Sequence, residues 1–383
     1  MTIPSDFALT RHRKFFAKYE ATIGTFAKPA GTDAAKVLRA DLGLDIERKV
    51  RMDSRQTRDA LELITGLAVA PWSIEAYVLP SGTAGTPPDL HDLFYACMGG
   101  YTNTPATSDA YALASGTVLR TLSLVDHYSD RYMRALKGAF VDKMKISSKG
   151  GEEPKVTFEG FAMGHIHTGT STLNGAMGGV ATMVVQTADS YNFEAGSVVA
   201  VDDSTNAGAG FQITVDSARP SFTLEAVVTE SNGANVTPYS PTETTAGNPI
   251  NGIGGSLTID GGSAVPILGV DVSLDNKIKP RDDEAFQQFP TGGIPDYREV
   301  TGELTVRAHA NQILELGKRK AFGARAILIT LGTVAGKKCV ISIPYAEFKF
   351  TQEEFPDGDS GIIKLPFIGK GSSGEDSLAV TFQ

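Results

Sequence analysis

A stretch of seventeen residues occurs twice in this chain, and this repeat constrains the fold more than any other feature of the sequence. The first copy, VLRADLGLDIERKVRMD, covers Val37–Asp53, and the second, ILGVDVSLDNKIKPRDD, covers Ile267–Asp283. Aligned without a gap, the copies are identical at seven positions, including the pair Asp41 and Asp271. A match of this quality between distant segments predicts two copies of one structural unit.

The segments that follow the two copies come in the same order. A strand-like run comes first, at Trp72–Val78 in one half and at Val300–Arg307 in the other. A short helix is expected next, at Pro88–Met98 and at about His309–Phe322. Each half then continues with two strands, a loop and a closing strand. We therefore expect the two halves to share one topology.

The first of these expected helices has a well-defined apolar face. Leu93 and Phe94 fall on this face together with other apolar residues at helical spacing. Pro88 suits the first turn of a helix, and Gly99–Gly100 is a typical end. Leu93 and Phe94 are therefore expected to pack in the core.

The repeats define the expected domain boundaries. We expect an N-terminal arm at 1–14, repeat one at 15–164 and repeat two at 250–383, with an insertion at 165–249. The insertion consists of short β-branched runs separated by Gly, Asn and Asp, which is typical of a small β barrel or sandwich. Stretches rich in Pro, Thr and Gly at its two ends are expected to be linkers.

Composition excludes several classes of protein. With 35 basic and 44 acidic residues the formal net charge is −9, so no basic excess is present to hold nucleic-acid phosphates. No apolar run approaches the roughly eighteen residues of a membrane-spanning helix, and the first residues lack the apolar segment of a signal peptide. The only cysteines, Cys97 and Cys339, lie far apart and form no disulfide framework. We expect a soluble, β-rich protein made in a reducing cytoplasm, with no membrane partner.

No motif in the sequence indicates an enzyme. His165 and His167 lie on one face of an extended segment, but no third metal ligand follows at a suitable spacing. Asp357–Gly361 resembles part of a calcium loop, yet it lacks the ligand spacing and the final Glu, so a turn is expected. Cys97 lies on the apolar helix face and is expected in the core. The sequence therefore predicts no catalytic residue, no metal site and no cofactor.

The repeated segment alternates in polarity, as a strand with one buried face does. Its apolar residues are expected to pack in the core or ring, and its acidic residues are expected on the opposite face. A solvated outer sheet face is the simpler interpretation, but two copies that keep the same aspartates favour a shared role. The apolar set is Leu42, Leu44, Val272 and Leu274, and the acidic set is Asp41, Asp45, Glu47, Asp271 and Asp275.

Three segments resemble the major tail tube protein of a tailed bacteriophage with a long non-contractile tail, a siphophage. Trp72–Phe94 has the family's order of strand, Gly turn, strand and short helix. Arg298–Val306, with the sequence REVTGELTV, is similar to the family's strand pattern r-x-v-t-G-x-l-x-v. The third segment runs from Val340–Pro344 through Asp357 to Leu365–Phe367. The resemblance covers both repeats and leaves out the insertion.

The resemblance implies a mainly β fold with short helices, in which two tandem β-sandwich repeats with long hairpins carry an inserted small β domain. Members of this family form stacked six-fold rings whose hairpins join into one β barrel around a lumen. Because this chain carries two repeats, three copies would complete a pseudo-six-fold ring, a homotrimer, with a hexameric ring as the alternative. The implied role is a structural one in the virion tail, as the conduit for DNA ejection.

The resemblance also implies a set of partners. These are other copies of the chain, the tape measure protein and genomic DNA transiently in the lumen, and the tail terminator and distal tail proteins at the ends. The acidic set would line the lumen and repel DNA phosphates. The main alternative is a β-rich adhesin or binding protein that acts through the insertion. A hydrolase with an unrecognised site and the tube of a secretion or contractile injection machine are further alternatives.

Overall fold

The structure is a computed structural model, and several expected features lie outside the residues that it describes. These are the second helix at 309–322, the loop at 357–360 and the ends of the two repeated segments at 51–53 and 282–283. The described residues are 12–50, 63–116, 119–216, 218–245, 247–252, 254–262, 264, 267–281, 287–307, 323–349, 353–354 and 361–383.

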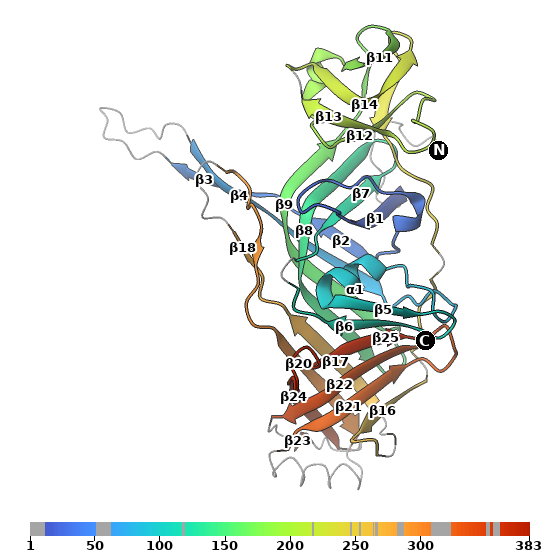
Figure 1. The fold of residues 1–383 in the computed structure, drawn as a ribbon, viewed down its shortest axis with the longest axis vertical. Coiled ribbons are helices and arrows are strands. Elements are labelled where there is room, and N and C mark those ends of the chain that lie inside the picture. Colours follow the sequence, from blue (N-terminus) through green and yellow to red (C-terminus); the bar gives the residue numbers. More distant parts are fainter. Residues whose placement is uncertain are drawn as a thin grey trace, which may run out of the picture.

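One antiparallel sheet joins the two halves of the chain (Figure 1). Its continuous layer has the order β2–β4–β9–β8–β17–β20–β24–β22, in which each strand pairs with the next. The first four strands come from the first half and the last four from the second. Their bounds are β2 Arg39–Leu42, β4 Leu63–Tyr77, β9 Lys155–Thr168, β8 Tyr132–Lys149, β17 Ile267–Asp275, β20 Glu299–Arg307, β24 Ile362–Gly369 and β22 Cys339–Phe348.

Two further pairs of strands extend this layer in the same way. In the first half, β1 (Arg13–Tyr19) pairs with β7 (Leu122–Tyr128), which pairs with β8. In the second half, β16 (Gly255–Ile259) pairs with β21 (Arg325–Leu331), which pairs with β22. The pairing order is therefore β1–β7–β8–β9–β4–β2 in one half and β16–β21–β22–β24–β20–β17 in the other, with corresponding strands in the same order along the chain.

The two halves share one apolar core. Leu42 from β2 and Val272 from β17 belong to the same cluster of buried side chains. Helix α1 (His91–Met98) contributes Leu93 and Phe94 to this cluster, which confirms the expected helix and its buried face. The helix ends at Gly99, whose φ of 87° is a conformation that glycine adopts without a steric penalty.

A second connection between the halves lies at the C-terminus. Strand β5 (Gly99–Thr104) forms a hairpin with β6 (Ser108–Leu113), and β6 pairs with β25 (Ala379–Phe382). Strand β25 in turn pairs with β22. The end of the chain is therefore fixed between the first and the second half, which makes the body one folded unit and not two separate ones.

The segments that link β2 to β4 and β17 to β20 differ between the halves. Strand β3 (Asp45–Val50) pairs with the first part of β4, and together they project from the body as an arm (Figure 1). In the second half the described part of the corresponding segment forms the two-residue strands β18 (Lys279–Pro280) and β19 (Gly293–Ile294). It follows the base of the arm, where the Ala68 N–H donates to the Gln288 carbonyl at 2.7 Å.

The insertion folds as a separate curled sheet with the order β10–β15–β12–β13–β14–β11 and has its own apolar core. It also packs on the first half, because Val198 of the insertion joins a buried cluster with Phe16 and Ile166. The ends of the insertion that were expected to be linkers include β10 and the end of β15, and residues 239–245 follow without regular secondary structure. The bounds are β10 Ser171–Thr172, β11 Met177–Val184, β12 Val198–Val201, β13 Phe211–Asp216, β14 Ser221–Glu230 and β15 Asn235–Pro238, with short 3-10 helices at Thr187–Asn192 here and at Gly31–Asp33 in the first half.

No helix in the described ranges has both the length and the apolar character that a membrane span requires.

Candidate functional site: a polar sheet face and two open strand edges

The continuous layer has one buried and one polar face, because side chains alternate along each strand. On β17, Val270, Val272 and Leu274 are buried while the residues between them are partly exposed. The same alternation holds along β20, β24 and the body part of β4, and along β8 and β9 except where 135–136 and 138–141 of β8 and 161–162 of β9 are buried in succession. The acidic residues on the polar face are Asp41, Glu75, Glu159, Asp271, Asp275, Glu299 and Glu303, and the basic residues are Arg39, Lys143, Lys145, Lys149, Lys155, Arg307 and Lys364.

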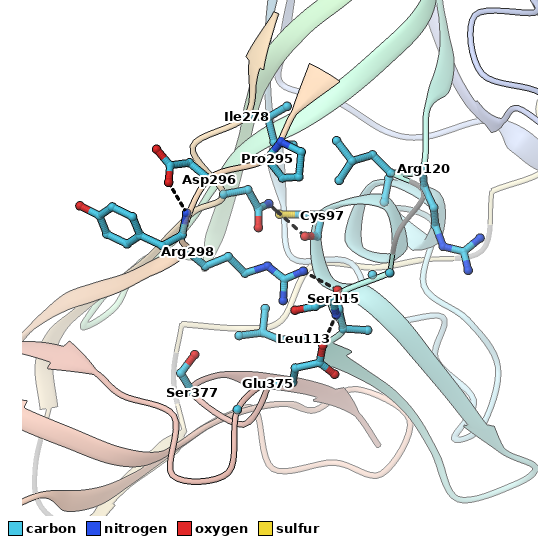
Figure 2. Close-up of a pocket in the computed structure, with 18 of the residues that line it drawn as sticks. Cys97, Leu113, Ser115, Arg120, Ile278, Pro295, Asp296, Arg298, Glu375 and Ser377 are labelled. Atoms are coloured by element: carbon cyan, nitrogen blue, oxygen red, sulfur yellow. Dashed lines mark hydrogen bonds between the residues drawn. The ribbon is translucent and has the colours of Figure 1, made fainter. Parts of the chain in front are cut away.

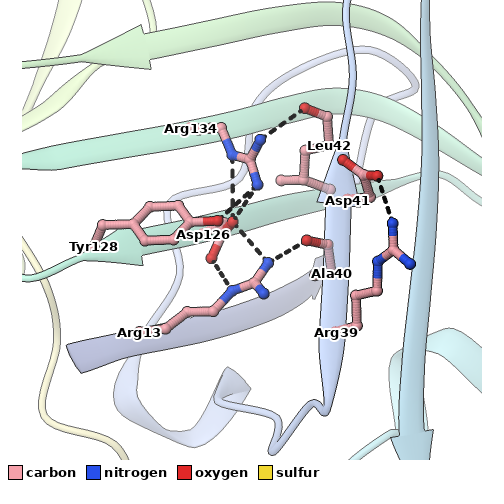
Figure 3. Close-up of polar contacts among 8 residues, drawn as sticks. All are labelled: Arg13, Arg39, Ala40, Asp41, Leu42, Asp126, Tyr128 and Arg134. Carbon is pink, nitrogen blue, oxygen red and sulfur yellow. Dashed lines mark hydrogen bonds and ion pairs between the residues drawn. The ribbon is translucent and has the colours of Figure 1, made fainter. Parts of the chain in front are cut away.

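The polar face brings together three of the five acidic residues singled out from the sequence. Asp41 forms an exposed ion pair with Arg39 at 3.3 Å on β2 (Figure 3). On β17, Asp271 lies 3.4 Å from the Lys145 ammonium, and Asp275 lies 4.0 Å from the neighbouring lysine of β8. Asp41 also borders a groove of about 460 Å³ together with Lys143 and Glu159, so residues of several strands face one space.

The other two acidic residues lie elsewhere. Asp45 and Glu47 are on β3 and therefore on the projecting arm, where both are exposed. Glu47 pairs with Lys49 on the same strand at 3.0 Å. The sequence repeat could not separate these residues from Asp41, because the strand breaks after Leu42 and resumes in a new direction as the arm.

The same break corrects the expectation for Leu44. Leu42, Val272 and Leu274 are buried, with exposures of 2%, 0% and 1%, but Leu44 is 44% exposed. Leu44 lies between β2 and β3, where the alternation of the strand is lost, and so it does not pack in the core of the chain. Its counterpart Leu274 is buried because β17 continues without interruption to Asp275.

Sequence reasoning missed the basic residues of the polar face. Lys143, Lys145 and Lys149 follow each other on one side of β8, and β8 lies between β9 and β17. A further pair joins Lys155 of β9 to Glu75 of β4 at 3.4 Å. The alternating lysines in DKMKISSK were a usable signal, but which strand lies beside β8 depends on pairing across more than a hundred residues. The face is therefore of mixed charge.

One open edge belongs to β2. This strand pairs with β4 on one side, and among the described residues no strand pairs with its other side. The carbonyls of Ala40 and Leu42 point toward this edge, where they accept hydrogen bonds from Arg13 and Arg134 (Figure 3). The second copy of the repeat differs, because the matching edge of β17 pairs with β8 from Gly269↔Lys149 to Asp275↔Lys143.

The other open edge belongs to β22. Strand β21 pairs with β22 up to Ala346, while β24 holds the opposite side from Ala346 to Phe348. Beyond Ala346, at Glu347 and Phe348, the side of β22 that β21 occupies earlier has no partner strand in the described part of the chain. In the first half the corresponding side of β8 is occupied, first by β7 up to Ala139 and then by β17.

A pocket of about 490 Å³ lies where the two halves meet, between α1 and the segments around Arg298 and Glu375 (Figure 2). Its polar groups bind each other across the two halves. Arg298 donates to the Ala114 carbonyl, Glu375 accepts from the Ser115 N–H, and Asn276 Nδ2 donates to the Cys97 carbonyl at 3.0 Å. These three hydrogen bonds join the two halves, and the polar groups that form them are bound to each other.

The pocket contains no activated nucleophile. Burial raises the pKa of the Cys97 thiol to about 12, so the reactive thiolate is not populated near neutral pH. No group of three or more His, Cys, Asp or Glu side chains suited to a metal ion occurs in the ranges that the structure describes. Cys97 is a core residue, as its position on the helix predicted.

These features define a β-structured protein whose distinctive surfaces are strand edges and a sheet face. Comparison with protein families gives a match to the family described as phage tail tube protein over residues 10–368. The chain therefore belongs to the phage tail tube family and is a structural, non-enzymatic component of the phage tail. A comparison with individually curated proteins gave no significant match.

Proposed function

We propose that this chain forms the tail tube of a phage with a long non-contractile tail, as stacked rings of three copies around a lumen for DNA. Tail tube proteins self-assemble into a tube. The finer points of the proposal are the number of copies in a ring, the strands that join them and the surface that lines the lumen. Each rests on a separate observation.

The junction between β8 and β17 carries the proposal. Within one chain, the edge strand of the second half extends the sheet of the first half by antiparallel pairing over seven residues. The two open edges, on β2 and β22, are the counterparts of β17 and β8. If β2 of one copy pairs with β22 of the next, the junction inside the chain is repeated between chains, and the sheet closes without free edges.

The duplicated pairing order supports a ring of three. Each chain contributes two units with the same order of strands, so three chains supply the six units of a pseudo-six-fold ring. A ring of six chains would contain twelve units and would need a much smaller rotation at the junction inside each chain. The relation between the halves of one chain thus sets the curvature that its neighbours continue.

The polar face is proposed to line the lumen. Its opposite side is filled by the common core, so this face is the one available to a channel. The acidic lining expected from the sequence is modified in this proposal, because Asp271 and Asp275 pair with Lys145 and Lys143 of β8. Lysines held in ion pairs attract phosphate less than free lysines do. DNA and the tape measure protein would then slide past a surface that does not retain them.

The insertion is proposed to lie on the outside of the tube. It sits at one end of the body, where it packs on the ends of β8 and β9 (Figure 1). Its separate core means that it contributes no strand to the layer. A role in binding another partner, as an adhesin would have, remains compatible with this position and would be additional to the tube.

Electron microscopy of the purified chain in negative stain tests the proposal. The expected result is rings or stacked tubes with a central lumen, whose number rises with protein concentration. Particles that remain monomeric at every concentration and bind glycans through the insertion would contradict the tube and support the adhesin alternative.

A further inference from the structure

A cluster of two arginines around one buried aspartate lies beside the open edge of β2 (Figure 3). The Asp126 carboxylate is fully buried and accepts from Arg13 Nε at 2.7 Å and from Arg134 Nη2 at 2.9 Å. Arg134 also donates to the Tyr128 hydroxyl at 2.8 Å, and both guanidinium groups lie near the Tyr128 ring. The carboxylate and the ring therefore fix both arginines in position.

The remaining donors of these arginines reach the backbone of β2. Arg134 Nη1 donates to the Leu42 carbonyl at 3.3 Å, and Arg13 Nη2 donates to the Ala40 carbonyl. These are the backbone groups that a strand pairing with β2 would use. The arginines thus cover the edge of β2 in the isolated chain.

The second half shows what such an edge does when it is not covered. Val270 and Val272 correspond to Ala40 and Leu42 in the repeated segment. The β17 edge that carries them pairs with β8, where Val270 faces Ser148 and Val272 faces Ile146. A paired strand lies about 4.8 Å away, in the space that a guanidinium group on the carbonyl fills. The arginine cap and a partner strand therefore exclude each other.

We propose that Arg13 and Arg134 form a displaceable cap on the β2 edge, and that β22 of a second copy of this chain removes the cap when a ring forms. The proposal rests on the ring assembly described under Proposed function. The occupant is a second copy because β22 has the matching edge open at Glu347–Phe348 among the described residues, and because β8 and β17 already form the same junction within the chain. Asp126 keeps both arginines paired after they leave the carbonyls.

The cap has a definite consequence for assembly. An exposed strand edge binds other chains without control, and covering it is a known way to prevent this. A cap of two charge-assisted hydrogen bonds must be broken before two free subunits can pair, so the first contact between them is less favourable. When a subunit joins an existing ring, the full pairing of β2 with β22 compensates for the loss of these two bonds. The subunit would therefore stay monomeric at low concentration.

The test compares the concentration at which assembly starts in the unaltered chain and in a double variant, Arg13→Lys with Arg134→Lys. Lysine keeps the positive charge beside Asp126 but cannot bond the carboxylate and a carbonyl through one planar group. We expect assembly, followed by light scattering, to start at about a tenfold lower concentration, which corresponds to one such hydrogen bond. The control is Arg39→Lys, because Arg39 lies on β2 with its side chain 74% exposed and pairs with Asp41 on the polar face.

A second measurement uses the unaltered protein, so that the result does not depend on how the variants fold. In a ring structure determined by cryo-electron microscopy, the Arg134 guanidinium is expected to have left the Leu42 carbonyl, with a strand of the neighbouring copy beside β2. An unchanged or higher starting concentration for the double variant, or rings in which both arginines still bond β2, would overturn the cap. Rings would then exist without it, and the proposed function would stand. A chain that forms no rings under any condition would overturn both.

Discussion

The two halves of this tail tube protein pair their strands in the same order, yet the outer edge of β17 and that of its counterpart β2 have different partners. In the second half, the outer edge of β17 is used within the chain, because β8 pairs with it along seven residues. In the first half, the outer edge of β2 faces two arginines. In the proposed assembly, the junction at β17 is completed within the chain and the matching edge of β2 is available to another subunit.

The halves also differ in what they do with the link between the first two strands of the repeat. The first half extends it as the β3–β4 arm, whose Val50 and Ile64 are exposed, and the second half folds it along the base of that arm. Within the described residues one chain therefore has one arm, and in the proposed ring of three copies there would be three. The two halves thus differ in this link although their strands pair in the same order.

The largest expected effect comes from blocking the junction inside the chain. The Val270 N–H faces β8, since Leu268, two residues earlier on β17, accepts through its carbonyl from Gly150, the residue directly after β8. Val270→Pro removes this donor, and we expect a loss of about 3 kcal/mol or more in the free energy of unfolding. The control Val270→Ala shortens the side chain and keeps the donor, so the difference between the two variants measures the backbone bond. Chemical denaturation gives both values, and equal losses would contradict the junction.

The matching substitution in the first half should separate folding from assembly. Ala40 corresponds to Val270 but lies on the open edge, where its N–H has no partner strand in the described part of the chain. Ala40→Pro is therefore expected to change the free energy of unfolding by only about 1 kcal/mol, because proline is tolerated at strand edges. Ring formation should be lost, as judged by negative-stain microscopy. Normal rings from a folded Ala40→Pro chain would show that β2 is not the joining strand.

Acid is expected to weaken the first half through His127. This residue lies on β7 and is buried against Phe16, and both of its ring nitrogens lack a hydrogen-bond partner within the described structure. Burial, assisted by Lys14, lowers the pKa of His127 to about 3, from 6.5 for the free side chain. Between these values the unfolded chain binds a proton that the folded chain excludes. The free energy of unfolding should therefore fall as the pH drops, by about 1.4 kcal/mol per unit.

His127→Phe removes this titration and keeps an aromatic ring in the same place. Its unfolding free energy should depend less on pH between 6.5 and 4 than that of the unaltered chain. Thermal unfolding at several pH values measures the difference. Identical pH profiles for the two proteins would mean that acid acts elsewhere.

A smaller effect is expected from the charges of the polar face. It should change the rate of DNA ejection and not the stability of the fold. Asp41→Lys with Asp271→Lys adds positive charge from both halves, and the second change also removes the carboxylate paired with Lys145. DNA ejection from phage carrying this variant should slow, and the slowing should shrink at high salt. As a control, Asp203→Lys in the insertion makes the same change of charge per substituted residue, at an exposed position away from this face. Equal ejection rates at low salt, with intact tails, would remove the polar face from the lumen.

The smallest effect is expected from deleting the insertion. Residues 171 and 236 pair with each other across β10 and β15, so the chain can be closed there with a short Gly bridge. Because the insertion has its own core, the deleted chain should still form rings in negative stain. Loss of rings from a folded deletion variant would show that the insertion takes part in the tube.

Local patterns in the sequence predicted the local structure well. Helix α1 and the alternation along β17 follow from residue spacing, because each depends on neighbours a few positions away. The short β-branched runs of the insertion form strands as expected, among them β12, β13 and β14. The burial of Leu44 in the core of the chain was predicted wrongly, because a break in a strand changes the direction of every later side chain.

Features that depend on distant pairing could not be predicted in this way. The junction of β8 with β17 joins residues that are more than a hundred positions apart, and no local signal specifies it. The positions of the lysines on the polar face and of the arginines around Asp126 can be interpreted only when the pairing of distant strands is known. The repeat predicted that two units exist, and the structure supplies how they meet.

The mass of a single ring, measured by native mass spectrometry on rings released from the tube, tests the central claim most directly. The claim is that the two halves of each chain stand in the same relation as neighbouring chains, so that three chains close a ring. We expect a mass of three full-length chains. A mass of six chains would contradict the claim, because the junction inside the chain would then not set the curvature of the ring.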